Sequence, residues 1–351
     1  MRRVFDDLAR HSISLLPINF SRETDMTISR RAALIGAAVL TLATPALAQD
    51  AAWPSKPLHT FVGFPAGSSP DLLARIVTEP LAAALGQPIV IENKPGAGGV
   101  IGIQQMLNAK DQDYTFGTTI NGPMTTAPRM VPDLGYDVAA DVAPVAMIAT
   151  SPLVLVVAAD FAADDLAGFV AAAGEEPEVV SYGSVGKGSG AHLTAELFSD
   201  RAGVEMLHIP YTSYAEVTTA IIGGEIDSGF MAPSAAMQYV EAGTLKILGI
   251  TSQAPFDQAP GVPVMAGQAG LPDDFRAELW NAFIAPAGTD EAIINKLNAD
   301  INVILADPAV QKRLADMGWQ VAGGTAAELQ QRIVEDTAIW GTVLDRIDTK
   351  N

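Results

Sequence analysis

The spacing of apolar and polar positions predicts strands that alternate with helices along the chain. Residues 58–64 form a short apolar run that predicts a strand. Residues 71–85 then carry apolar side chains at helical spacing, with Pro80 as an expected kink or break. The order continues with a strand at 88–92, a Gly-rich turn, a helix at 100–109 and a strand at 114–119. This alternation predicts an α/β fold with a mainly parallel sheet whose faces are both covered.

The same alternation returns after residue 146. The strands expected there are 152–158, 179–182, 204–209, 226–231 and 245–251. The expected helices are one that ends at Ala202, one at 216–222 and one at 235–241. Residues 253–274 are rich in Pro, Gly and Ala, which predicts a long surface connection. An apolar segment at 280–285 precedes a tail that is expected to be helical from 289 to 348, with interruptions at Asp307-Pro308 and Gly318.

The first 48 residues predict an export signal rather than part of the fold. Arg30 and Arg31 precede the apolar stretch 32–42, which is too short to span a bilayer, and Ala46-Leu47-Ala48 supplies a cleavage pattern. The paired arginines favour the twin-arginine export route. Met26 offers an alternative start, in which case residues 1–25 are an over-called extension. The mature protein is therefore expected in the periplasm.

Chain length and charge restrict the kinds of partner. About 300 residues remain after the export signal. Because this length exceeds the usual size of a domain with a single hydrophobic core, two domains are expected. The formal charge is −19, and the export segment holds six Arg against four acidic residues, so its removal takes the charge to −21. Such an acidic chain repels nucleic acid and anionic lipid. The chain has no Cys, which excludes disulfides, thiolate metal sites, a Cys nucleophile and a lipid anchor on Cys.

The segment GSVGKGSG at 183–190 invites a nucleotide-binding interpretation. A phosphate-binding loop of the Walker type needs Ser or Thr after its Lys, and here Gly188 follows Lys187. The looser dinucleotide pattern is satisfied by Gly186, Gly188 and Ala191, but the next strand carries its one acid, Glu205, near its start rather than at its carboxyl end. An NAD(P)-dependent enzyme that uses residues 186–191 is therefore kept as an alternative.

Other catalytic constellations are missing from the sequence. Neither the loop at 65–71 nor the loop at 183–192 contains the Gly-x-Ser-x-Gly turn of a serine hydrolase. The three histidines of the mature chain, His59, His192 and His208, are too scattered to resemble a metal cluster. No nucleophile, base and orienting group come together, so we expect a binding protein without cofactor or metal, and not an enzyme. In a binding protein built from two α/β halves, Gly-rich turns would border a cleft at the carboxyl ends of the strands.

Several segments, in this order and spacing, resemble the substrate-binding proteins of tripartite tricarboxylate transporters, known as the TctC or Bug family. They are WPSKPLHTFVGFPAGSSPDLLAR at 53–75, LGQPIVIENKPGAGGVIG at 85–102, YDVAADVAPV at 136–145, GSVGKGSGAHLTAELF at 183–198, IPYTSYAEVTTAIIGGEIDSGF at 209–230 and GLPDDFRAELWNAFIAPAGT at 270–289. The resemblance implies a two-lobed periplasmic binding protein of type II-like architecture, with two doubly wound domains around a ligand cleft. The first lobe would comprise residues 49–150 and 277–351, and the second residues 151–276. A monomer that captures a small organic carboxylate for the membrane components of such a transporter is expected, and a receptor that feeds a sensor is a further alternative.

The resemblance also implies that the loops 65–71 and 183–192 face each other and hold a carboxylate largely through backbone amides, hydroxyls and ordered water. The acidic composition agrees, because a chain with few cations has to offer an anion N–H groups, which Gly lets approach closely. The candidate ligand-binding residues are Phe64, Ala66, Gly67, Ser68, Ser69, Asp71, Asn121, Ser184, Gly188, Ser189, His192, Thr212, Tyr214 and Asp227. Asp71 is expected chiefly to cap its helix.

Two departures from the family pattern affect this site. Pro70 removes one N–H donor from the first loop, so its amides are expected to be rearranged. Tyr214 brings a large ring to the loop after the strand 204–209, where it is expected to narrow the pocket or stack on a ligand.

Overall fold

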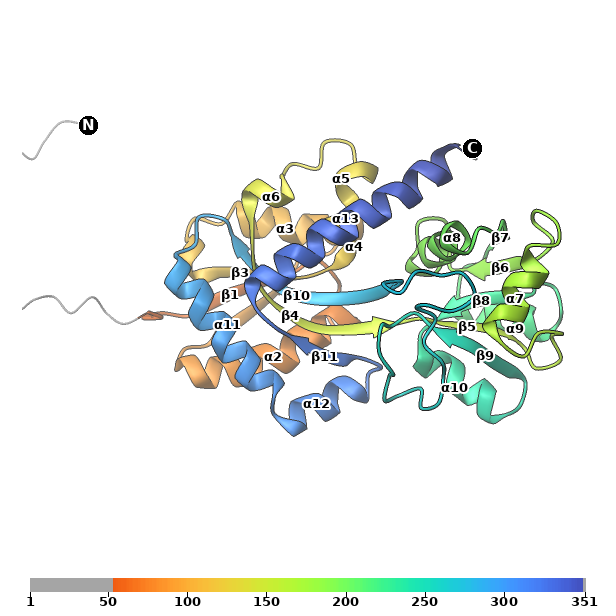
Figure 1. The fold of residues 1–351 in the computed structure, drawn as a ribbon. Helices are drawn as coiled ribbons and strands as arrows, with labels where there is room; N and C mark the ends of the chain where they lie inside the picture. Colours follow the sequence, from red (N-terminus) through yellow and green to blue (C-terminus); the bar gives the residue numbers. More distant parts are fainter. Residues whose placement is uncertain (1–52, 350–351) are drawn as a thin grey trace, which may run out of the picture. The chain divides into compact units, whose positions relative to one another are not determined.

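The computed structural model describes residues 53–349, so the predicted export signal lies outside the described residues (Figure 1). Its first sheet has, among these residues, six strands in the order β11-β4-β10-β3-β1-β2. Their bounds are Leu58–Val62 for β1, Ile89–Asn93 for β2, Thr115–Ile120 for β3, Val142–Pro152 for β4, Glu278–Pro286 for β10 and Gln320–Gly323 for β11. Strands β1, β2 and β3 are parallel, whereas β10 is antiparallel to β3 and β4, and β11 is antiparallel to β4.

The second sheet has, within the described part of the chain, five strands in the order β7-β6-β8-β5-β9. They are β5 (Val154–Ala158), β6 (Ser181–Ser184), β7 (Leu207–Pro210), β8 (Ser228–Met231) and β9 (Leu245–Ile250). Strands β6, β7 and β8 are parallel, and β5 is antiparallel to β8 and β9. Both sheets are thus mixed rather than mainly parallel.

Helices surround these sheets. They are α2 (Ser69–Leu85), α3 (Val100–Leu107), α4 (Asn121–Thr125), α5 (Ala127–Met130), α6 (Val138–Asp141), α7 (Leu166–Ala173), α8 (Gly190–Ala202), α9 (Tyr214–Ile222), α10 (Pro233–Glu241), α11 (Glu291–Leu305), α12 (Pro308–Ala315) and α13 (Ala326–Thr349), with short 3-10 turns at Ala97–Gly99 and Gln112–Tyr114. Helix α2 continues through Pro80 without a break. The predicted interruptions at Asp307-Pro308 and Gly318 are confirmed, but the tail also contains the strand β11, which the apolar pattern did not indicate.

The chain passes between the two sheets at two places. Strand β4 ends at Pro152 and β5 begins at Val154, so Leu153 alone connects them, and the chain returns through Ala277 into β10. Thr251 links both crossings, because its hydroxyl accepts from the Leu153 N–H at 2.9 Å and donates to the Ala277 carbonyl at 2.5 Å. The antiparallel direction of β10 follows from this route, since β10 enters the first sheet from the second.

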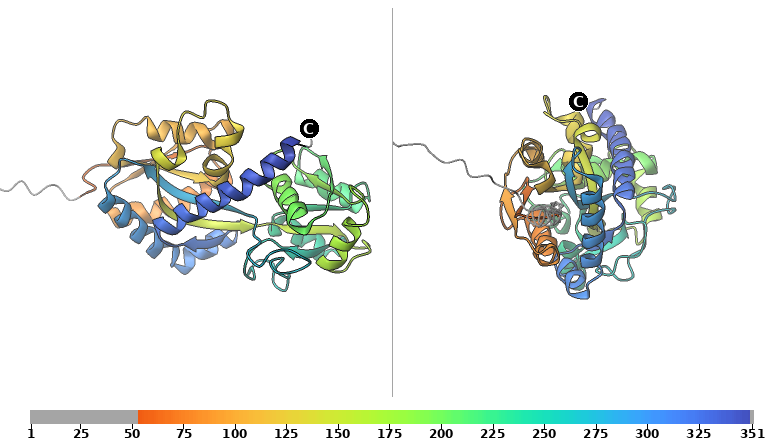
Figure 2. Two further views of the ribbon diagram at one scale, coloured as in Figure 1. Left: turned by 45° about the horizontal axis from the view of Figure 1, so that its top comes forward. Right: turned by 90° about the vertical axis from the view of Figure 1, so that its left-hand side faces the viewer.

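Helix α13 belongs to the cores of both sheets. Leu329 and Ile333 in its first half pack in a cluster with Trp280 of the first sheet. Trp340, Leu344 and other residues of its second half pack in the cluster of the second sheet. The dark blue α13 accordingly extends from the first sheet toward the second in Figure 1 and in the left view of Figure 2. Within residues 53–349, no helix is both long and apolar enough to cross a bilayer.

Candidate functional site

A cavity of about 160 Å³, here called the central cavity, lies where both sheets contribute loops. Its walls come from the end of β3 and α4, the start of α8, the start of β10 and the middle of α13; the residues are Ile120, Asn121, Gly122, Thr126, Gly188, Gly190, Leu193, Thr194, Glu278, Leu279 and Trp340. Strand β3 of the first sheet ends here, and the loop that follows β6 of the second sheet contributes Gly188. The cavity therefore sits at the carboxyl ends of parallel strands, where α/β sheets place ligands.

The lining of the central cavity is mainly apolar, with a few polar side chains and no cation. Asn121, Thr126 and Thr194 bring an amide and two hydroxyls, whereas its one ionisable side chain, Glu278, pairs with Arg332 of α13 at 3.2 Å. Gly190 lets α8 approach β10 closely, because a Cβ at this position would lie 3.0 Å from the Leu279 side chain. A carboxylate entering this space would meet hydroxyl and amide donors.

The loop at 64–69 is held in place by Asp71. The Asp71 carboxylate is buried and accepts hydrogen bonds from Gly67 N at 2.8 Å and from Arg75 and Asn93 at 2.9 Å. Burial alone would raise the pKa of Asp71, but the hydrogen bonds from Arg75, Gly67 and Asn93 outweigh it and hold the pKa below its ordinary value. Asp71 therefore fixes the loop that precedes α2, but it does so from the first turn of the helix and not as its cap, because Ser68 is the N-cap residue.

The other side chains of this loop also make their contacts within the protein. Both the N–H and the hydroxyl of Ser68 donate to the Pro65 carbonyl, at 3.1 and 2.6 Å. Ser69 Oγ accepts from the indole N–H of Trp319 at 3.0 Å. The Phe64 ring packs against Gly99, in another loop of the first sheet. A Cβ on Gly99 would lie within 2.9 Å of both the Phe64 ring and Pro123 of α4. None of the predicted residues from Phe64 to Asp71, Ala66 included, lines the central cavity.

In the second Gly-rich loop, at 183–192, the polar groups also bond within the protein. Ser189 caps α8 by accepting from His192 N at 3.3 Å. Gly188 N donates to His192 Nδ1 at 3.1 Å, and Ser184 Oγ lies 2.7 Å from His208 Nε2. Gly188 lines the central cavity, whereas Ser184 and Ser189 are not part of its wall.

Beneath this loop, the buried His192 ring packs at a tilt against the half-buried His208 ring. Their ring centroids are 4.2 Å apart, and the Tyr182 ring lies 5.0 Å from that of His208. Burial, and then the positive charges of His208 and Lys187, lower the pKa of His192 to about 4. The imidazole of His192 is consequently neutral at physiological pH and acts as an acceptor for the loop rather than as a cation.

Three predicted residues of the second sheet lie outside the central cavity. Thr212 donates through its N–H and hydroxyl to Glu216, at 2.9 and 2.8 Å. The Tyr214 ring packs against the second sheet's core clusters, although we expected it to narrow the pocket or stack on a ligand. Asp227 precedes β8 and accepts from Ser181 N and Oγ at 2.8 and 2.6 Å. Because Asp227 lies at the amino end of β8, the structure places it at the opposite edge of the sheet from the central cavity.

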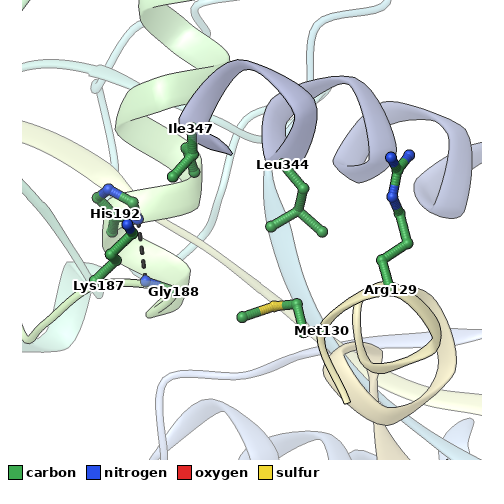
Figure 3. Close-up of a pocket in the computed structure, with 7 residues that line it drawn as sticks. All are labelled: Arg129, Met130, Lys187, Gly188, His192, Leu344 and Ile347. Atoms are coloured by element: carbon green, nitrogen blue, oxygen red, sulfur yellow. Dashed lines mark hydrogen bonds between the residues drawn. The ribbon is translucent and has the colours of Figure 1, made fainter. Parts of the chain in front are cut away.

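A second cavity, here called the rim cavity, adjoins the central one at Gly188 and has a volume of about 390 Å³ (Figure 3). It is lined by Arg129, Met130, Lys187, Gly188, His192, Leu344 and Ile347. Figure 3 shows Leu344 and Ile347 extending from α13 toward the space between α5 and the Gly-rich loop. Met130 reaches the loop itself, since a Cβ on Gly188 would lie 3.2 Å from its Cε.

The sequence thus indicated part of the cavity lining and missed the rest. Asn121, Gly188 and His192 were predicted and line one or both cavities. The contributions of α5 and α13 were missed, because the spacing of Trp340, Leu344 and Ile347 marks one face of a helix but not the surface that it will cover. Among residues 53–349, no group of His, Asp and Glu side chains gathers with the geometry to hold a metal ion.

Comparison with known proteins places this chain among bacterial receptors. A family profile described as "Tripartite tricarboxylate transporter family receptor" matches residues 73–349. Protein BugT of Bordetella pertussis is 32% identical over 326 residues, which cover 93% of this chain and 99% of that protein. The structure of a TctC solute-binding protein from Polaromonas aligns with a TM-score of 0.76 at 26% identity, covering 84% of this chain and 99% of that one. The structure "R. palustris Rpa4515 with adipate" aligns with a TM-score of 0.65 at 28% identity, covering 84% and 97%.

Proposed function

The chain belongs to the receptor family of tripartite tricarboxylate transporters, and from this premise we propose that it binds a small organic carboxylate in the central cavity. The family consists of periplasmic solute-binding proteins, and the resemblance noted in the sequence is confirmed. The proposal extends to export by the twin-arginine route and to delivery of the ligand, by a monomeric receptor, to the membrane components of such a transporter.

The observation that carries this proposal is the lining of the central cavity. Loops from both sheets meet there, and the Asn121 amide and the Thr194 hydroxyl offer hydrogen-bond donors in a chain with few cations. A space of about 160 Å³ lies below the usual range of ligand pockets, which favours a small acid over a nicotinamide dinucleotide. The similarity to Rpa4515, whose structure is described as containing adipate, supports the same ligand class.

The test is a thermal-shift screen of the purified mature protein against mono-, di- and tricarboxylates, with NAD and NADP included. A ligand at 100 times its dissociation constant should add about 2.7 kcal/mol to the free energy of unfolding through mass action on the native state. The ligand should be recovered unchanged after long incubation. A shift with the nicotinamide cofactors and with no carboxylate would instead favour the enzyme alternative.

A pair of variants ties binding to the cavity. Thr194→Val replaces a lining hydroxyl with a methyl group of similar size and should weaken the carboxylate about three- to tenfold, the range of one net hydrogen bond. Thr342→Val makes the same change on the exposed face of α13 and should leave affinity unchanged. Isothermal titration measures both. Equal affinities for Thr194→Val and wild type would argue against the central cavity as the site.

A further inference from the structure

We propose that the rim cavity is a second anion site, which binds a monocarboxylate with an apolar chain or ring. This site is separate from the central cavity and does not rest on the function proposed for it. Its wall combines two cationic side chains, Arg129 and Lys187, with the apolar side chains of Met130, Leu344 and Ile347. A cavity of about 390 Å³ whose wall combines polar and apolar groups has the size of a small-molecule site.

The charges around the rim cavity favour an anion. Of the Lys and Arg residues that the structure describes, only Lys110 and Lys187 have no carboxylate within ion-pair distance, and Lys187 lines this cavity. His192 adds no charge at neutral pH, because it is buried and neutral. Lys187 is therefore the side chain most available to a carboxylate.

Arg129 is the second cation, and a carboxylate of the protein itself contacts it. Its guanidinium pairs with Asp345 of α13 and lies over Gly341, where a Cβ would be 3.0 Å from Arg129 Nη1. Asp345 is more than half exposed, with 62% of its side chain accessible, so it can leave the pair without being buried unpaired. A bound carboxylate would share Arg129 with Asp345 or replace it.

The apolar wall determines the rest of the ligand. Leu344 and Ile347 belong to the core cluster of the second sheet, and each presents its remaining surface to the cavity. Met130 is half exposed and comes from α5 on the opposite side. An unbranched Met side chain adapts to ligands of different shape. A carboxylate head between Lys187 and Arg129 thus has an apolar surface beside it for the body of the same molecule.

The experiment is isothermal titration of the mature protein with octanoate, with octan-1-ol as the uncharged probe. Arg129→Gln and Lys187→Gln should each weaken octanoate by about tenfold, because charge-assisted hydrogen bonds to a carboxylate are roughly twice as strong as neutral ones. The matched controls Arg313→Gln and Lys312→Gln remove the same charges from exposed pairs on α12 and should not change octanoate affinity. Octan-1-ol should bind weakly and equally to all variants.

Asp345→Asn gives the sharpest outcome. This change removes the competing carboxylate from Arg129, so octanoate should bind more tightly than to wild type, whereas a purely structural role of the pair would give weaker binding. The proposal is overturned if wild type binds no octanoate at millimolar concentration, if the double variant of Arg129 and Lys187 binds it as well as wild type does, or if Asp345→Asn weakens it.

A competition experiment separates this site from the central cavity. Wild type saturated with a carboxylate that depends on Thr194 should still bind one equivalent of octanoate. Complete displacement of one by the other would show a single site and contradict the proposal. If the screen finds no ligand for the central cavity, the octanoate titrations still decide the rim cavity alone.

Discussion

At the scale of single residues, the side chains predicted to hold a ligand mostly shape the loops that carry it. Asp71, Ser68, Ser189 and Thr212 each bond to groups within a few residues along the chain. Such local bonds are what short polar side chains offer at helix starts and turns, so a motif rich in them is ambiguous in a sequence. Only the three-dimensional position of such a residue shows whether it shapes a loop or contacts a ligand. Asp227 lies at the far end of its sheet from the central cavity, and Tyr214 packs into the core of the second sheet.

Asp71→Asn tests the structural role at this scale. The variant should lose about 2 kcal/mol of unfolding free energy at pH 7, because a buried ionised acceptor of four hydrogen bonds is replaced by an amide. The pKa of Asp71 is lowered by folding, so its stabilisation is complete above the unfolded-state pKa, about 3.9, and is lost as pH falls through the lower folded-state value. Denaturant unfolding should therefore show a smaller difference between wild type and variant near pH 2 than at pH 7. The exposed control Asp160→Asn should change stability by less than about 0.5 kcal/mol at either pH.

At the scale of elements, periodicity predicted most strands and helices, and it failed where two elements meet without a polar break. The strands β4 and β5 are separated by one apolar residue, Leu153, so their boundary has no turn signal. Strand β11 has four residues, lies at the edge of its sheet and alternates between exposed and half-buried positions, which resembles a loop. The helical character of the tail was predictable, but the contact of α13 with two cores depends on tertiary structure.

A buried ion network anchors α13 beside the return crossing. Asp336 is 3% exposed, accepts from the Trp280 indole N–H at 2.8 Å and pairs with Arg332 at 2.9 Å, and Arg332 also pairs with Glu278. Asp336→Ala should cost about 3–5 kcal/mol of unfolding free energy, because it leaves buried charge and an indole donor without their partner. The control Asp316→Ala removes an exposed carboxylate from an i,i+4 pair on α12 and should cost less than about 1 kcal/mol. Chemical denaturation compares them, and equal losses would show that the network contributes nothing beyond a surface pair.

At the scale of the whole molecule, the two sheets are joined by few connections. The two crossings at Leu153 and Ala277 meet at Thr251, and α13 is the element that packs against both cores. The fold class was predictable because the alternation of strands and helices and the family resemblance agree. The division into lobes at residues 150/151 and 276/277 stays a prediction, as does its consequence that the lobes move as rigid bodies about these crossings.

Ligand-dependent closure gives the final prediction. Because the central cavity takes its walls from both sheets, a bound carboxylate contacts both and should favour a conformation in which they lie closer together. The radius of gyration from small-angle X-ray scattering should then decrease when the mature protein is saturated with the carboxylate found by the screen. Gly188→Asp should abolish both binding and the decrease, since Gly188 has a φ of 80°, borders both cavities and would bring a negative charge beside the ligand. A carboxylate that binds tightly to wild type without changing the radius of gyration would contradict closure and would mean that the receptor presents its ligand in the unliganded arrangement of its lobes.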